Sequence, residues 1–317
     1  MKRQIGILGT GSAVPQRILT NAELETMVDT SSEWIVSRTG IRERRIASPE
    51  DTSSKLAHQA ALRALEAAGL EAADLDLIIC ATVTPDMPFP ATACLVQELL
   101  GVNAIPAFDL SAGCSGFGYA ISVARGLLTS GQYHRALVIG VDLLSRITDY
   151  TDRSTCVLFG DGAGAVILGQ VPAGYGVLSG DLGADGSGGD FLQMPQQYIQ
   201  MTGTEVFKFA VRVMEESTKR VLDQAGLTTE QVQWVVPHQA NIRIISAAAA
   251  RLAISEERFF VNVDRYGNTS AASIGLALDE LARSGRLCDG DYVVLVGFGA
   301  GLTWSALLVR WWSGGVA

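Results

Sequence analysis

The chain has 317 residues, of which 48% are hydrophobic and 18% charged, a composition that suits a globular protein with an ample core. Its formal net charge of −9 disfavours nucleic acid as a partner, and no apolar run is long enough for a signal peptide or a membrane span. Five scattered cysteines and three histidines predict a reduced, cytoplasmic protein without disulfides or a metal site.

The N-terminal segment contains a Gly9-x-Gly11 pattern that also occurs in dinucleotide-binding proteins. The third small residue of that pattern is replaced by Val14, and Pro15 follows where the helix should already have begun. We therefore interpret the segment as a strand that enters a glycine-rich loop.

A dense basic cluster follows, in which Trp34 lies close in sequence to Arg38, Arg42, Arg44 and Arg45. Arginine suits phosphate geometry and tryptophan offers a stacking face, so the cluster could bind a phosphorylated ligand. A solvated charged face explains the same residues equally well.

The next residues predict an α/β pattern. A helix begins at a cap formed by Asp51 or Thr52 and ends at Gly69, and an apolar strand follows over residues 75–82. A proline-rich loop at 85–90 leads to a second helix that runs through Leu95 to Leu100.

The most informative stretch lies around Cys114, where an apolar strand turns sharply into a helix. Helical spacing starts at Phe117 and stops at Gly131. A helix N-terminus stabilises a thiolate, and its unpaired N–H groups can hold an oxyanion. We therefore expect a reactive cysteine with a lowered pKa; the alternative is a small buried cysteine that fills space between strand and helix.

The pattern repeats later in the chain. The sequence around Gly226 resembles that around Gly69, and Gly297 matches Gly140, both at an offset of 157 positions. The repeat predicts two α/β halves, residues 1–170 and 171–317, each with a mostly parallel sheet covered by helices.

The second half contains two more candidate residues. Asn268 is the counterpart of Cys114 when positions are counted back from the glycines that end the two helices. His238 follows a buried strand, close to a helix that begins near Ala240, and carboxyl ends of strands favour ligand sites in α/β folds. His58 and His134 are interpreted as structural or surface residues.

Together these motifs resemble the β-ketoacyl-[acyl-carrier-protein] synthase III family of thiolase-fold condensing enzymes. The resemblance covers nearly the whole chain and rests on SSEWIVSRTGIRERRIA, DLSAGCSGF, DRSTCVLFGDGAGA, VPHQANIRIIS, DRYGNTSAAS and GFGAGLTW, in that order. It implies a duplicated fold with two five-stranded, mixed or mostly parallel sheets in an αβαβα layering.

The resemblance also implies a decarboxylative Claisen condensation. Cys114 would accept the acyl group of an acyl-CoA, while His238 and Asn268 would stabilise the enolate formed from malonyl-[acyl-carrier protein]. The backbone amides of Cys114 and Ala300 would form the other oxyanion hole, although many family members have glycine at the position of Ala300. No permanently bound cofactor is implied; acyl-CoA is a substrate.

Further roles follow from the resemblance alone. CoA or substrate would contact Trp34, Arg38, Arg153, Gly203, Phe207, Ala240, Asn241 and, from a partner subunit in a homodimer, Phe89. The acidic carrier protein would dock on Lys208 and on the run Gln239, Ala240, Asn241, Ile242 and Arg243.

Three other functions remain open. A Cys-His-Asn hydrolase uses the same residue types and would need an ion pair between Cys114 and His238. A non-catalytic CoA-binding or acyl-carrier-binding module could keep the fold. A specialised acyltransferase or condensing enzyme of secondary metabolism would share every motif.

Overall fold

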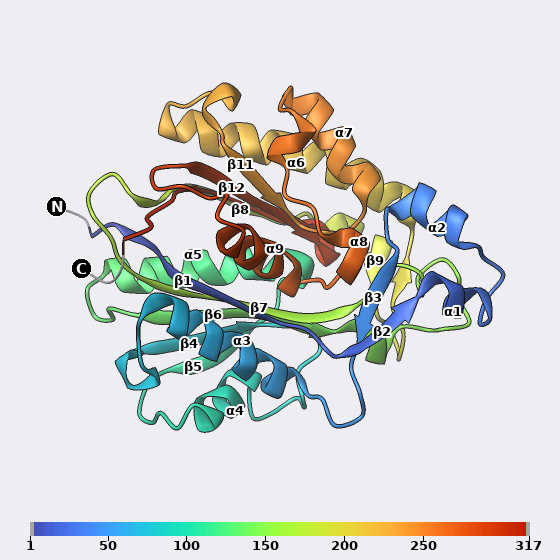
Figure 1. Ribbon diagram of the computed structural model, residues 1–317, viewed down its shortest axis with the longest axis horizontal. Coiled ribbons are helices and arrows are strands. Elements are labelled where there is room, and N and C mark those ends of the chain that lie inside the picture. The colour runs from blue at the N-terminus through green and yellow to red at the C-terminus, as the bar shows by residue number, and fades with distance from the viewer. Residues whose placement is uncertain (1–2, 315–317) are drawn as a thin grey trace.

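Two mixed β-sheets lie between three layers of helices in the computed structural model, which describes residues 3–314 (Figure 1). The first sheet has the strand order β1 (Ile5–Ala13), β7 (Asp161–Gln170), β6 (Ala136–Leu143), β4 (Leu77–Ala81) and β5 (Ala107–Leu110). The second has the order β11 (Trp234–Pro237), β12 (Tyr292–Gly299), β13 (Thr303–Arg310) and β8 (Gly176–Gly183). The layering is therefore αβαβα, and the predicted fold class is confirmed.

The layer in which each helix lies corresponds to how much of its surface is apolar. Central α5 (Gly116–Thr129) and α9 (Ala272–Arg283) pack between the sheets, so they are apolar on most faces. The outer helices bury one face each: α3 (Ser53–Ala68) and α4 (Thr92–Leu99) cover the first sheet, and α6 (Gly203–Ala225) and α7 (Ile242–Leu252) lie over the second.

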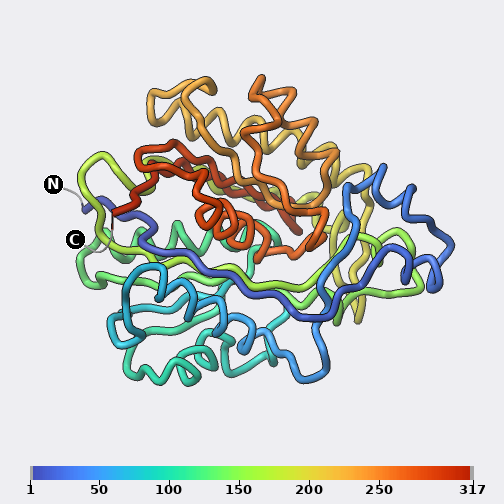
Figure 2. The backbone as a smooth tube through the Cα atoms, viewed as in Figure 1, coloured from blue at the N-terminus to red at the C-terminus, as the bar shows by residue number. Residues whose placement is uncertain are grey.

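Small elements extend one end of the molecule. They are the helices α1 (Asn21–Glu25), α2 (Ser32–Thr39) and α8 (Val263–Tyr266), the ribbon of β2 (Arg17–Thr20) with β3 (Glu43–Ile46), and the ribbon of β9 (Leu192–Gln193) with β10 (Gln200–Met201). The tube view shows α1, α2 and both ribbons at the same end of the sheets (Figure 2). No helix within residues 3–314 is long and apolar enough to cross a membrane.

The duplication is visible in the order of elements. Helices α3 and α6 both stop at a left-handed glycine, Gly69 with φ 66° and Gly226 with φ 68°, and each continues through a short 3-10 turn into a strand. Strand β4 begins at Leu77 and β11 at Trp234, which preserves the offset of 157 positions. The prediction of two halves divided at 170/171 places the division in the connection between β7 and β8.

The second sheet differs from the prediction of five strands. Where β5 would have a counterpart, the chain makes one isolated parallel bridge, Phe259 with Val235, and then turns into α8. The sheets are also less parallel than predicted, because β7 pairs antiparallel with both β1 and β6, and β13 pairs antiparallel with both β12 and β8.

Strand β1 runs through the glycines that were expected to form a loop. A Cβ at Gly9 would overlap Ala64 of α3, and one at Gly11 would overlap the carbonyl oxygen of Ala60. These glycines therefore allow α3 to lie directly on β1, and they belong to the packing of the first sheet.

We predict that Gly11→Ala lowers the free energy of unfolding by about 1–3 kcal/mol, because the added methyl group forces β1 away from α3. The matched control is Gly126→Ala in α5, where no atom lies within 4 Å of the new Cβ. That variant should be neutral or gain up to about 1 kcal/mol from helix propensity. Urea unfolding at one protein concentration measures both; equal stability of the two variants would contradict the packing role of Gly11.

Candidate active site

Cys114 lies at the junction of the two sheets. Strand β5 ends at Leu110, a 3-10 turn spans Gly113–Ser115, and α5 begins at Gly116. Gly113 adopts a left-handed conformation with φ 55°, which glycine tolerates best. At the end of β12, a Cβ on Gly299 would lie 2.5 Å from the Cys114 backbone nitrogen. The second half therefore reaches the nucleophile only because its strand ends in glycine.

The prediction of a lowered thiol pKa is wrong for this site. Burial raises the pKa of the Cys114 thiol to about 12, and the negative charge of Asp142 acts in the same direction. A hydrogen bond with the Ser270 side chain and the Cys114 backbone N–H oppose the shift but do not outweigh burial. Cys114 is consequently a protonated thiol, and the thiolate has to be generated during the reaction.

His238 follows β11 and is 1% exposed. Its backbone N–H donates to the carbonyl of Val296, and its Nδ1 lies 2.6 Å from Oγ of Ser273 in the first turn of α9. The ring packs edge-on against Phe298 at 5.1 Å. Burial lowers the pKa of His238 to about 3, so the imidazole is neutral at physiological pH.

Both backbone polar groups of Asn268 are hydrogen-bonded. Its backbone N–H donates to Leu158, and its carbonyl accepts from Gly160. The side-chain Oδ1 accepts from the Ser270 backbone N–H at 2.9 Å, which leaves the Nδ2 amide group for the cavity that Asn268 lines. This arrangement presents a hydrogen-bond donor beside His238.

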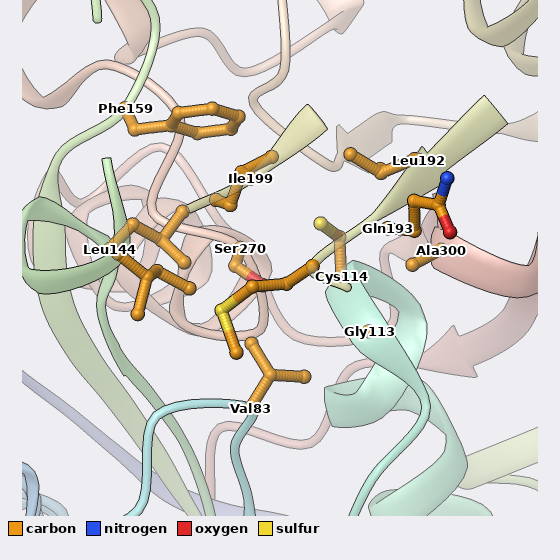
Figure 3. Close-up of a pocket in the computed structure, with 12 residues that line it drawn as sticks. Val83, Gly113, Cys114, Leu144, Phe159, Leu192, Gln193, Ile199, Ser270 and Ala300 are labelled. Atoms are coloured by element: carbon orange, nitrogen blue, oxygen red, sulfur yellow. The ribbon is translucent and has the colours of Figure 1, made fainter. Parts of the chain in front are cut away.

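Cys114, His238 and Asn268, distant in sequence, line one cavity of about 130 Å³. Its wall also includes Phe207, Asn241, Gly203 and Ala240. On the other side of Cys114 a second cavity of about 200 Å³ is almost wholly apolar, and Figure 3 shows Val83, Leu144, Phe159 and Ile199 on its wall. Cys114 thus stands between a chamber that contains His238 and Asn268 and an almost wholly apolar cavity.

A groove of about 640 Å³ leads outward from the chamber that contains His238 and Asn268. The groove and the chamber share four lining residues: Gly203, Phe207, Asn241 and Leu158. At the surface the groove is lined by Trp34, Arg38, Lys208 and Arg243. The structure therefore brings six of the eight predicted CoA- or substrate-contacting residues to one path that ends at Cys114, while Arg153 and Phe89 do not line it.

The basic cluster divides into two parts. Arg38 lines the groove, but Arg44 is completely buried and donates to Asn21 and to the carbonyls of Leu19 and Val157. The Arg44 side chain therefore connects the segments around Leu19 and Val157 by hydrogen bonds, and it does not belong to a surface patch. Arg153, predicted beside the same ligand, stacks over Trp34 at 4.8 Å and donates to the carbonyl of Asp29.

One predicted docking residue is misplaced. Gln239 is 1% exposed, and its side chain donates to Pro237 and Phe260 and accepts from the amides of Asn262 and Val263. All its hydrogen-bonding capacity is used internally, so the prediction that Gln239 contacts a carrier protein is wrong.

The neighbours of Gln239 differ from it in exposure. Ile242 is half-buried against Gly40, whereas Arg243 is exposed over the ring of Phe207 and Lys208 is exposed beside Glu205.

Phe89 is 83% exposed in the proline-rich loop, the most exposed of the large hydrophobic side chains in residues 3–314.

Ala300 occupies the turn after β12. Its backbone nitrogen would lie 2.9 Å from a Cβ on Gly113, so this amide is adjacent to the turn that carries Cys114. Compared with the glycine expected at this position, Ala300 adds a methyl group but keeps the backbone N–H that can donate a hydrogen bond.

Sequence reasoning missed three residues near the reactive ones. Ser270 donates its N–H to Asn268, Ser273 contacts His238, and the charge of Asp142 acts on Cys114. The motif that holds Ser270 and Ser273 was recognised, but nothing in it distinguishes a serine that caps a helix from one that contacts a reactive side chain. A positive φ of 49° at Ser270, a strained conformation for a serine, marks the position only in the structure.

The layered fold, with a cysteine at the start of a central helix, defines a thiolase-fold enzyme. A family model described as 3-oxoacyl-[acyl-carrier-protein] synthase III matches residues 108–186, and the C-terminal model of that name matches residues 222–311. The chain is 55% identical to a β-ketoacyl-[acyl-carrier-protein] synthase III of Desulfitobacterium hafniense, over 98% of this chain and 99% of the relative. The corresponding protein of Caldanaerobacter subterraneus is 53% identical, over 96% and 97% of the two chains.

Solved structures agree with these relatives. The 3-oxoacyl-[acyl-carrier-protein] synthase III of Aquifex aeolicus matches with a TM-score of 0.95 and 50% identity, over 97% of this chain and all of that one. The priming β-ketosynthase of the R1128 polyketide pathway matches with a TM-score of 0.93 and 37% identity, over 98% and 97%. The chain belongs to the β-ketoacyl-[acyl-carrier-protein] synthase III family, and it is an acyltransferase of the condensing type.

We predict that His238 stays neutral from pH 8 to pH 5 in the folded protein, because burial lowers its pKa to about 3. In the unfolded chain the His238 imidazole binds a proton as the pH falls through about 6.5, whereas in the folded chain it does not. His238 therefore lowers the free energy of unfolding as the pH falls below about 6.5. Imidazole nitrogen chemical shifts measured across this range, assigned with His238→Gln, test the prediction. A titration midpoint between pH 6 and 7 would contradict it.

Proposed function

We propose that the chain condenses an acyl-CoA primer with malonyl-[acyl-carrier protein] and so initiates fatty-acid synthesis. The observation that carries this proposal is the convergence of Cys114, His238 and Asn268 in one buried chamber at the end of a groove of about 640 Å³ that opens to the surface. The apolar cavity behind Cys114 suits the hydrocarbon part of an acyl group.

In the first half-reaction, the Cys114 sulfur attacks the thioester carbon of acyl-CoA. Trp34, Arg38 and Arg153 contact the adenine and phosphates at the mouth of the groove, since a guanidinium pairs with phosphate and an indole ring stacks on a base. Negative charge develops on the carbonyl oxygen, and the amides of Cys114 and Ala300, which lie where the turns at Gly113 and Gly299 meet, donate to it. CoA leaves, and the acyl group remains on Cys114.

In the second half-reaction, His238 and Asn268 stabilise the enolate. The Nδ1 atom of His238 lies 2.6 Å from Oγ of Ser273, and we assign the hydroxyl as the donor in this pair, so that the ring proton is on Nε2. The Asn268 amide supplies a second donor. Both donors hydrogen-bond the thioester oxygen of the malonyl group, whose charge grows as CO2 departs. The carbanion then attacks acyl-Cys114 and releases the β-ketoacyl-carrier protein.

The hydrolase alternative requires a thiolate–imidazolium pair. The structure disfavours that pair, because burial raises the pKa of Cys114 and lowers that of His238. A neutral histidine suits hydrogen bonding to an enolate and does not suit proton storage beside a thiolate. A specialised condensing enzyme of secondary metabolism would use the same chemistry with a different primer.

The carrier protein and the oligomer belong to the same proposal. Lys208 and Arg243 stand at the mouth of the groove, where they can attract an acidic carrier protein. Exposed Phe89 and Met87 give the proline-rich loop an apolar tip, which supports a homodimer in which Phe89 reaches the partner's acyl cavity. Since CoA and carrier protein are its substrates, we place the enzyme in the cytoplasm.

We predict that Cys114→Ala abolishes formation of an acyl-enzyme, because no other thiol lines the two cavities in the described residues. His238→Ala and Asn268→Ala should each still become acylated, but should lose malonyl-thioester decarboxylation by about 10²–10³-fold. Intact-protein mass after exposure to acyl-CoA and release of labelled CO2 measure the two steps. A His238→Ala protein that fails to acylate would overturn the separation of roles.

A further inference from the structure

The two amides that the proposed function uses as an oxyanion hole lie on turns from different halves of the chain. The amide of Cys114 belongs to the 3-10 turn Gly113–Ser115, and that of Ala300 to the 3-10 turn Ala300–Leu302 after β12. Figure 3 shows Gly113, Cys114 and Ala300 close together, and a Cβ on Gly113 would lie 2.9 Å from the Ala300 nitrogen. Two donors stabilise one oxygen atom well only while their positions are kept within about 0.5 Å. Contacts between the two turns must therefore fix the distance between the amides.

The side chain of Thr303 makes such contacts. Thr303 is the first residue of β13, and its Oγ1 lies 3.0 Å from the carbonyl oxygen of Ala112 and 3.1 Å from that of Ala300. A hydroxyl has one proton, which two nearby carbonyl oxygens can share in a three-centre hydrogen bond. Ala112 comes directly before the turn that carries Cys114, and Ala300 carries the second amide. One side-chain oxygen therefore joins the backbones of both turns.

Two serine hydroxyls support this bridge. The buried Ser115 hydroxyl lies 2.8 Å from Oγ1 of Thr303 and 2.7 Å from the Ala112 carbonyl oxygen. Ser305, two residues further along β13, donates to the carbonyl of Ser115 at 3.2 Å. The beginning of β13 is thus attached to the residues on both sides of Cys114, and Thr303 is the member of this group that also reaches Ala300.

The turn of Ala300 has a backbone conformation that needs such support. Gly301 and Leu302 are both left-handed, with φ 73° and φ 46°, and this region is unfavourable for leucine. The Leu302 side chain is buried against Gly188, and the Leu302 carbonyl accepts from the Asp185 N–H at 3.3 Å. These contacts hold the far side of the turn, whereas the contact of Thr303 with the Ala300 carbonyl holds the side next to Cys114.

We propose that Thr303 is a positioning residue for the oxyanion hole. Its hydroxyl binds the carbonyl oxygens of Ala112 and Ala300, and so sets the distance between the amides of Cys114 and Ala300. The residues that line the two cavities at Cys114 do not include Thr303, so it acts through the two turns and not on the substrate. Thr303 thereby accelerates the steps in which charge develops on the carbonyl oxygen of the acyl group.

The inference rests on the proposed function, and single-turnover acylation by acetyl-CoA tests it. We expect Thr303→Val, which keeps the branched shape but removes the hydroxyl, to slow acylation at saturating acetyl-CoA by about 10-fold. That loss is smaller than the 10²–10³-fold effect of deleting an oxyanion donor, because both amides remain. Thr303→Ser keeps the hydroxyl and should restore the rate to within about twofold of wild type. The affinity for acetyl-CoA should not change, since the groove does not include Thr303.

Two further measurements distinguish positioning from a general structural role. Malonyl-thioester decarboxylation should stay within about threefold of wild type in Thr303→Val, because it uses the donors of His238 and Asn268. The carbonyl stretching band of isotope-labelled acetyl-Cys114 should shift to higher frequency in Thr303→Val and return in Thr303→Ser, because weaker hydrogen bonds leave a stiffer C=O bond.

The matched control is Thr129→Val. It removes a hydroxyl that donates to the Arg125 carbonyl at 2.7 Å in the last turn of α5, and it should acylate at the wild-type rate. Should Thr303→Val fail to fold, Ser115→Ala replaces it. This variant removes the hydroxyl that supports Thr303, and it should slow acylation by about threefold.

The outcomes are distinct. Wild-type acylation by the variant that lacks the hydroxyl, an unshifted carbonyl band, or an equal loss of acylation and decarboxylation would each overturn the positioning role and leave the proposed function intact. A wild-type protein that forms no adduct with any acyl-CoA would instead overturn the proposed function.

Discussion

Burial of the reactive residues between the two sheets is the constraint on which the site depends. Cys114 and His238 lie in the central layer, where a charged group loses its hydration. Both side chains are therefore neutral at rest, a thiol and an imidazole. A neutral histidine can donate one hydrogen bond to a developing enolate, which is the task of the second half-reaction. The same burial raises the pKa of the Cys114 thiol, so the thiolate has to be generated during the first half-reaction.

The duplication explains how one chamber obtains residues from distant parts of the chain. Each half directs the N-terminal end of its central helix, α5 or α9, toward the junction, so Cys114 and the segment from Asn268 to Ser273 face one another. Glycines at Gly113 and Gly299 permit the closest backbone approach at this junction. The two sheets differ, since the second has four strands where the first has five. The segment around α9 supplies hydrogen-bond donors, whereas the start of α5 supplies the nucleophile.

Sequence reasoning was most successful where local patterns decide the structure. The cap at Thr52 and the glycine stop at Gly69 are local signals, and the bounds of the helix between them follow from these signals. The chain's resemblance to one family then gave the functional class. Sequence reasoning failed where contacts between distant residues determine the environment of a side chain. The burial of Gln239 and Arg44 and the raised pKa of Cys114 depend on what packs around these residues. Serines behind the catalytic residues carry no sequence signal for the same reason.

The central claim is that Cys114 carries an acyl group which only a malonyl thioester removes. Intact-protein mass spectrometry of the wild-type protein tests it directly, first after mixing with acetyl-CoA and longer acyl-CoAs, then after addition of malonyl-[acyl-carrier protein]. We predict a mass gain located on Cys114 that persists in buffer and disappears on addition of the malonyl substrate, with formation of a β-ketoacyl-carrier protein. An adduct that decays in water at the same rate without the malonyl substrate would contradict the account and indicate a thioester hydrolase.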